Sequence, residues 1–73
     1  MGYSISYRRL EKFLKLKGFS HIRTDGSHRM FSNGYLTVPV PFHAGRDLKL
    51  GTIRSVLRLA GLSLAEFNQW LGR

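Results

Sequence analysis

The sequence contains no cysteine, few acidic residues and no long apolar run. The absence of cysteine excludes disulfide bonds and thiolate metal sites, and it favours a reducing, cytoplasmic location. No apolar run approaches the roughly 20 residues that a membrane-spanning helix needs, and no signal-peptide core follows the first residues, so we expect no membrane partner. With 73 residues the chain has room for one hydrophobic core, and we expect residues 1–73 to form a single domain.

Basic residues, in contrast, are abundant. Twelve Lys and Arg face four Asp and Glu, which gives a formal net charge of +8. The basic residues are spread along the chain and are not gathered in a tail. On a domain this small, such a charge predicts a polyanionic partner, which is nucleic acid in the first place, although an acidic protein fits the same evidence.

Three helices are expected from apolar spacing and from residues that favour helix ends. The first begins after Ser6 as N-cap and runs to Lys17, with Gly18 as the residue that stops it. The second spans residues 50–60, and Gly61 ends it. Ser63 and Glu66 form a capping box for a short third helix. The apolar positions that would face the core are Leu10, Phe13, Leu14, Ile53, Val56, Leu57, Ala60, Phe67, Trp70 and Leu71.

Three strands are expected between the first two helices, over residues 19–25, 28–32 and 35–40. Gly26 and Ser27 turn the chain between the first pair of strands, and Asn33-Gly34 predicts a two-residue type I′ turn between the second pair. Pro39 and Pro41 end the third strand or confine it to a sheet edge. The order α-β-β-β-α-α predicts an α+β fold, in which a three-stranded antiparallel sheet carries the helices on one face.

The predicted hairpin register assigns side chains to the two faces of this sheet. It places Ser32 opposite Tyr35 and Phe31 opposite Leu36, so Phe31 points towards the helices. His28 then points to the open face, at the start of its strand. Other side chains on the open face would be Met30, Tyr35 and Thr37.

Several motifs, taken in this order along the chain, resemble the HicA toxin family. They are Gly26-Ser27-His28 at a strand start, Val38-Pro39 at a strand end, residues 47–57 entering the second helix, and Ala60-Gly61-Leu62-Ser63 followed by Phe67. The resemblance implies a fold like the double-stranded-RNA-binding domain, ribonuclease activity against mRNA, and inhibition by a HicB antitoxin. Two features depart from the family pattern. Leu50 stands where proline is usual, and residues 39–43 are richer in proline.

The resemblance assigns catalysis to His28. RNA cleavage can use the neighbouring 2′-hydroxyl as nucleophile, so the enzyme needs chiefly a proton acceptor, a proton donor and positive charge near the phosphate. An imidazole fills either proton role at neutral pH, and such a group contributes about 10²- to 10⁴-fold to a rate. Without the resemblance, an exposed strand histidine with no role is the simpler interpretation. His21 and His43 are candidates for the second proton-transfer group; His21 would share the open face if Ile22 is buried.

Contacts to RNA are expected from cationic and hydroxyl side chains near His28 and on the second helix. Lys49 lies close to the start of that helix, where unpaired backbone N–H groups attract an anion. The predicted register places Arg29 on the core-facing side, opposite Val38. Its guanidinium would then have to reach solvent at the sheet edge. Tyr35 could stack on an unpaired base. The RNA-binding candidates are Arg23, Ser27, Arg29, Lys49, Arg54 and Arg58.

No metal or other cofactor is expected. The three histidines, with Asp25 and Asp47, match no local metal-ligand spacing. Two other functions fit parts of the sequence. A non-catalytic double-stranded-RNA-binding module would use the same scaffold and charge. A DNA-binding helix-turn-helix over residues 50–71 is disfavoured, because its second helix carries no Lys or Arg before Arg73.

Overall fold

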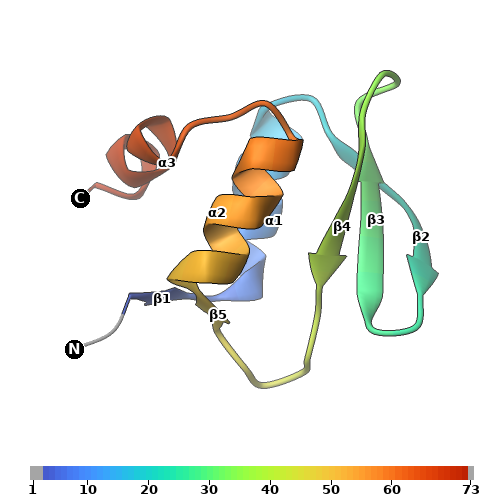
Figure 1. The fold of residues 1–73 in the computed structure, drawn as a ribbon, viewed down its shortest axis with the longest axis horizontal. Coiled ribbons are helices and arrows are strands. Elements are labelled where there is room, and N and C mark those ends of the chain that lie inside the picture. Colours follow the sequence, from blue (N-terminus) through green and yellow to red (C-terminus); the bar gives the residue numbers. More distant parts are fainter. Residues whose placement is uncertain (1–2, 73) are drawn as a thin grey trace.

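The structure, a computed structural model, describes residues 3–72 and has the expected α+β architecture (Figure 1). Strands β2, β3 and β4 form a three-stranded antiparallel sheet in that order, and β1 pairs with β5 in a separate two-stranded ribbon. In chain order the elements are β1 (Ser4–Ile5), α1 (Tyr7–Leu16), β2 (Ser20–Asp25), β3 (His28–Ser32), β4 (Thr37–Pro41), β5 (Leu48–Lys49), α2 (Leu50–Leu59) and α3 (Leu64–Leu71).

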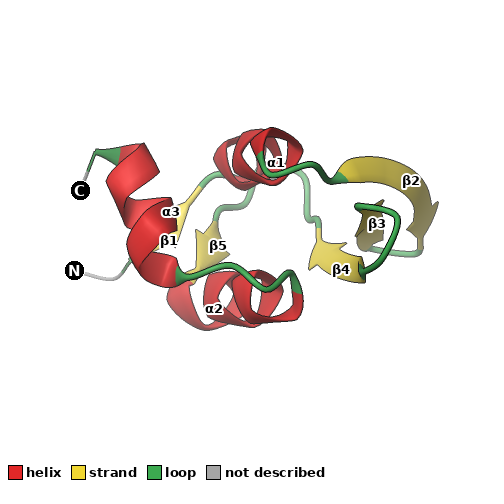
Figure 2. Ribbon diagram, turned by 90° about the horizontal axis from the view of Figure 1, so that it is seen from above, coloured by secondary structure: helices red, strands yellow, loops and turns green. Residues whose placement is uncertain are grey.

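The helices α1 and α2 lie between the three-stranded sheet and α3, as two perpendicular views show (Figures 1 and 2). The core fills the space among these elements, and within residues 3–72 Tyr7 is the only buried residue whose side chain carries a polar atom. None of the helices in this range is long and apolar enough to cross a membrane. The buried residues are Ile5, Tyr7, Leu10, Phe13, Leu14, Phe19, Phe31, Val38, Val40, Leu48, Ile53, Val56, Leu57, Ala60 and Phe67.

Helix α1 begins and ends where its sequence predicts. The hydroxyl of Ser6 accepts a hydrogen bond from the backbone N–H of Arg9 at 3.3 Å, which satisfies one of the free donors of the first turn. At the other end Gly18 adopts a φ of +93°, a conformation that glycine reaches without steric cost. The chain then turns back, and Phe19 N–H donates to the carbonyl of Leu14 at 2.9 Å.

Helix α3 is fixed by the predicted capping box and by aromatic packing. Ser63 and Glu66 exchange hydrogen bonds of 3.1 and 3.0 Å between side chain and backbone. The ring of Phe67 is fully buried and lies 5.0 Å from the ring of Phe13 on α1, and Trp70 lies 5.4 Å from the same ring. Phe67 therefore belongs to the core as predicted, whereas Trp70 packs against the core rings but is 39 % exposed, so the prediction that it is a core residue is wrong.

The predicted type I′ turn is wrong. Ser32 pairs with Thr37 and Phe31 with Val38, so the loop contains residues 33–36 and β4 starts two residues later than expected. A type I′ turn needs a positive φ at both central residues, and no residue other than glycine has one between residues 3 and 72. The Asn33 side chain closes the loop instead, because its Oδ1 accepts from the N–H groups of Tyr35 at 2.9 Å and Leu36 at 2.7 Å.

The displacement of the register preserves the predicted faces. Because side chains alternate with a period of two, a shift of two residues leaves Phe31, Val38 and Val40 on the core side. Leu36 leaves the sheet and is 42 % exposed, contrary to the prediction that it faces the helices. Tyr35 and Leu36 both lie in the loop, so Tyr35 is not part of the open face of the sheet.

The two-stranded ribbon was not predicted. Ser4 pairs with Lys49 and Ile5 with Leu48, which joins the segment before α1 to the segment before α2. Ile5 is 2 % and Leu48 is 6 % exposed, so the ribbon closes the end of the core that the three-stranded sheet does not reach. Strands of two residues carry no recognisable alternation, and their pairing joins distant parts of the chain.

Candidate active site

His28 is the first residue of β3, and its side chain is exposed on the face of the sheet that points away from the helices. The buried side chain of Phe31 fixes this orientation, because residues three apart on a strand lie on opposite faces. Asp25 of β2 and Pro41 of β4 lie directly opposite His28 on either side. The predicted exposure of His28 is thus confirmed, and its catalytic role stays a prediction.

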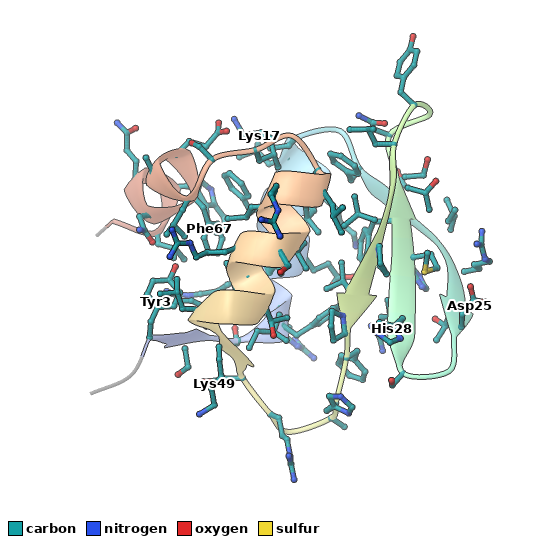
Figure 3. All side chains as sticks on the ribbon, in the orientation of Figure 1. Tyr3, Lys17, Asp25, His28, Lys49 and Phe67 are labelled. Atoms are coloured by element: carbon teal, nitrogen blue, oxygen red, sulfur yellow. The ribbon has the colours of Figure 1, made fainter. Side chains whose placement is uncertain are left out.

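Asp25 and Arg23 share the open face with His28. Figure 3 shows Asp25 and His28 at the same end of the sheet, and Arg23 lies on the same face because it pairs with Met30. The Nε of Arg23 lies 3.0 Å from Oδ2 of Asp25, with both side chains more than half exposed. An ion pair this exposed contributes little to stability, so a phosphate can compete with Asp25 for the guanidinium. An imidazole, a carboxylate and a guanidinium therefore meet at one accessible end of the sheet.

Ser27 and Arg29 adjoin His28 in sequence but lie differently. Ser27 is in the exposed turn before β3, and its carbonyl accepts from the N–H of Phe42 at 2.7 Å. Arg29 points to the opposite face from His28, and it lies opposite Val40, where the predicted register had placed Val38. Its guanidinium lies 3.8 Å from the ring centroid of Phe42 and 5.0 Å from that of Tyr7. These cation–π contacts hold the charge on the side of the helices, near the first residues of the central strand β3, and not at a sheet edge as expected.

The surroundings of Tyr7 show how closely this region is packed. Tyr7 is 5 % exposed, and its hydroxyl donates a hydrogen bond of 3.4 Å to Glu11. Burial raises the pKa of Tyr7 above its ordinary value, and the hydrogen bond with Arg29 partly offsets this rise. Tyr7 is therefore a neutral, anchored ring that supports Arg29.

The other histidines are placed differently from one another. The condition for His21 is not met, because Ile22 is 49 % exposed and a bulge separates His21 from Arg23. His21 pairs with Phe31 and lies on the side that faces the helices, with its Nε2 3.0 Å from the hydroxyl of Thr24. The prediction that His21 shares the open face is wrong. His43 is exposed in the loop after β4, two residues beyond the partner of His28.

The candidates on α2 form a separate surface. Lys49 is the N-cap of α2 and makes no side-chain capping bond, and Figure 3 shows it at the foot of this helix, apart from His28. Arg54 and Arg58 are exposed and line a shallow hollow with Leu57, Leu62 and Leu64. The structure therefore groups His28 with Arg23 and Ser27, and it places the α2 cations elsewhere.

One basic surface was missed at the level of sequence. An open groove, here called the α1 groove, runs along α1 and is lined by Arg8, Arg9, Lys12 and Arg29 together with Tyr7, Glu11 and Phe42. The local signal was the spacing of Arg8, Arg9 and Lys12 on one side of a well-capped helix. The described residues contain no group of three or more His, Cys, Asp or Glu side chains that could hold a metal ion.

Comparison with known proteins gives one match. A family model described as the HicA toxin of bacterial toxin–antitoxin systems matches residues 7–62, a range that contains α1, the three-stranded sheet and α2. A search of curated proteins and a search of solved structures gave no match.

Proposed function

The chain belongs to the HicA toxin family of toxin–antitoxin systems, and from this premise we propose that it is an endoribonuclease that cleaves mRNA in the cytoplasm without a metal ion. A HicB-type antitoxin would neutralise it. His28 is the proposed catalytic residue. The observation that carries the proposal is the exposed imidazole of His28 at the accessible end of the sheet, directly opposite Asp25 and on the same face as Arg23.

The proposed reaction needs only groups that this site offers. The ribose 2′-oxygen attacks the adjacent phosphorus, the bond from phosphorus to the 5′-oxygen breaks, and the products are a 2′,3′-cyclic phosphate and a free 5′-hydroxyl. His28 takes the proton from the 2′-hydroxyl or gives one to the leaving 5′-oxygen. Arg23 and the hydroxyl of Ser27 hold the scissile phosphate. His43 is the remaining candidate for the second proton transfer, since it follows the strand that pairs with His28.

The remaining cationic candidates bind RNA away from the scissile bond. Arg29, Lys49, Arg54 and Arg58 would contact phosphates that lie along the chain from the cleaved linkage, which strengthens binding without taking part in chemistry. This charge also suits an antitoxin with an acidic surface. Such a partner can cover the cations and His28 together, and it would block both RNA binding and proton transfer.

Induced expression of the wild type, His28→Ala and His21→Ala tests the proposal. We expect the wild type and His21→Ala to arrest growth and degrade mRNA. His28→Ala should do neither, because of these two histidines only His28 lies on the open face. Equal protein levels and equal binding of the antitoxin would show that the His28 variant folds. mRNA that stays intact with the wild type, or a shift of RNA without cleavage by the purified protein, would indicate a binding module instead. Arrest by His28→Ala would remove this residue from the mechanism.

A further inference from the structure

The basic residues of α1 up to Lys12 are unpaired, whereas Lys15 and Lys17, at the end of the helix, form ion pairs. Lys15 lies 3.6 Å from Glu11 and Lys17 lies 2.9 Å from Glu66. Arg8, Arg9 and Lys12 form no ion pair with an acidic side chain of residues 3–72. These three side chains line the α1 groove, in which Glu11 is the one acidic residue. The groove is therefore positive and lacks an internal counter-charge for most of its cations.

Arg29 supplies a further cation to this groove in a fixed position. Its guanidinium lies 3.8 Å from the ring centroid of Phe42 and hydrogen-bonds with Tyr7, and it forms no ion pair within residues 3–72. A guanidinium that stacks on one ring and gives one donor to a phenol keeps its other N–H donors in its plane for a ligand. A guanidinium presented in this way is prepared to bind a phosphate with little loss of conformational entropy.

The positive surface continues from the α1 groove to an exposed aromatic ring. Arg9 and Lys12 also line a second hollow, whose other walls are Trp70 and Leu71 of α3. Trp70 is the single tryptophan of the chain; it contacts the buried rings of Phe13 and Phe67, and it is 39 % exposed. An indole held from behind and open in front is a surface on which an unpaired base can stack.

The end of the α1 groove at Arg29 and Phe42 adjoins the strand and the turn that carry His28, although the two side chains Arg29 and His28 lie on opposite faces of the sheet. Arg29 lines the groove and is the direct neighbour of His28, and Phe42 hydrogen-bonds through its N–H to Ser27. A strand that leaves the groove past Arg29 has to pass around the end of β3, beside the exposed turn at Ser27, to reach the face on which His28 is exposed. The spacing of cations along the way suits a chain of phosphates, and the ring at the far end suits an unstacked base.

We propose that the α1 groove and the adjoining surface of Trp70 bind a single-stranded segment of RNA and lead it to His28. This inference rests on the proposed function for its choice of RNA as ligand. It adds Arg8, Arg9, Lys12 and Trp70 to the RNA-contacting residues, and it favours single-stranded over double-stranded RNA, because bases within a duplex are not available for stacking on a side chain.

Two double variants of α1 test the role of the unpaired charges. The probe is a short 2′-O-methyl oligonucleotide, which has no free 2′-hydroxyl and so separates binding from cleavage. Arg9→Gln with Lys12→Gln should weaken binding on the order of ten-fold and lower the slope of log affinity against log salt by about 1.4. Lys15→Gln with Lys17→Gln removes the same charge from residues that already form ion pairs, and we expect it to change the affinity for the oligonucleotide by less than two-fold. Thermal unfolding of both variants controls for folding.

The fluorescence of Trp70 tests base stacking directly, because no other tryptophan contributes. The 2′-O-methyl single strand should quench this fluorescence, and a duplex of the same sequence should quench it far less. Trp70→Leu should lower affinity for the single strand about five-fold or more, and Trp70→Phe should restore part of it, since a phenyl ring also stacks.

The inference is overturned if the single strand binds without quenching Trp70, if the two double variants lose affinity equally, or if duplex RNA binds and quenches as well as single strands. Loss of antitoxin binding alone in the Arg9 and Lys12 variant would also overturn it, in favour of a protein-docking surface. These outcomes do not depend on catalysis. A wild type that binds and is quenched but never cuts natural RNA would contradict the proposed nuclease function and leave the groove assignment intact.

Discussion

At the scale of single residues, His28 and Arg29 are adjacent in sequence and serve opposite faces of β3. His28 is exposed beside Asp25, whereas Arg29 points to the side of the helices, where its guanidinium lies over Phe42 and near Tyr7. This division follows from the alternation of side chains along a strand. It explains how one short strand offers an imidazole to one surface and a guanidinium to another.

The partly buried hydroxyl of Tyr7 makes stability sensitive to alkaline pH. The pKa of Tyr7 is raised above its ordinary value of 10.0, chiefly by burial, so the folded state holds this proton more tightly than the unfolded state does. The resulting stabilisation is complete below about pH 10 and is lost as pH rises through the folded pKa. We expect the free energy of unfolding to fall more steeply above about pH 10 in the wild type than in Tyr7→Phe.

Urea unfolding over this pH range measures the effect, and its slope with pH is the quantity to compare. Tyr35→Phe is the control, because Tyr35 is 95 % exposed at the tip of the hairpin loop. The same slope in the wild type and Tyr7→Phe would show that another group governs alkaline unfolding.

At the scale of elements, the loop between β3 and β4 depends on the side chain of Asn33. Its Oδ1 accepts the backbone N–H groups of Tyr35 and Leu36, so both Asn33→Ala and Asn33→Gly should lower the free energy of unfolding by about 1 kcal/mol. A type I′ turn would tolerate glycine at this position well. Chemical denaturation of both variants distinguishes the two loops, and an Asn33→Gly protein as stable as the wild type would speak against the observed one.

The capping box of α3 contributes stability that acid removes. The pKa of Glu66 lies below its ordinary value of 4.5, because its carboxylate accepts the N–H of Ser63 and also pairs with Lys17. This contribution is present above the ordinary pKa and is lost as pH falls through the folded pKa. We expect Glu66→Gln to make unfolding less dependent on pH below about pH 5. Asp47→Asn is a suitable comparison, since Asp47 is exposed and forms no ion pair within residues 3–72, and an equal effect there would contradict the prediction.

Elements were predictable from sequence where their signals are local. Ser6 and Gly18 mark the ends of α1, and Ser63 with Glu66 marks the start of α3, because helix ends are stabilised by residues a few positions away. The pairing of β1 with β5 joins residues more than 40 positions apart, and nothing local specifies it. The predicted hairpin register is wrong because Asn33 closes a four-residue loop: its N–H donates to the carbonyl of Leu36, and its side chain accepts from the N–H groups of Tyr35 and Leu36.

The candidate site was predictable only in part, for the same reason. The predicted face of His28 is correct because the register is displaced by two residues, and a displacement by an even number leaves every side chain on its predicted face. His21 was misplaced by a bulge that no residue pattern announces. The α1 groove was missed because its walls come from α1, β3 and the residue after β4, and only folding brings Arg29 together with Phe42 and Tyr7.

At the scale of the whole molecule, positive charge occupies two separate surfaces. The α1 groove lies along one helix, and Arg54 with Arg58 lies on the exposed side of α2; Figure 2 shows these helices apart from each other. Strand β2 is exposed along its entire length, so the edge of the sheet that carries Arg23 and Asp25 is open to solvent. A net charge of +8 attracts polyanions from a distance, and the local arrangement determines where one of them meets the imidazole.

The central claim is that the exposed imidazole of His28 moves a proton during RNA cleavage. The single-turnover cleavage rate of the purified protein on one single-stranded RNA measures this most directly, with wild type, His28→Ala and His21→Ala compared at saturating protein. We predict a rate about 10²- to 10⁴-fold lower for His28→Ala at unchanged RNA affinity, and a rate near that of the wild type for His21→Ala. Cleavage by His28→Ala at the wild-type rate would contradict the claim.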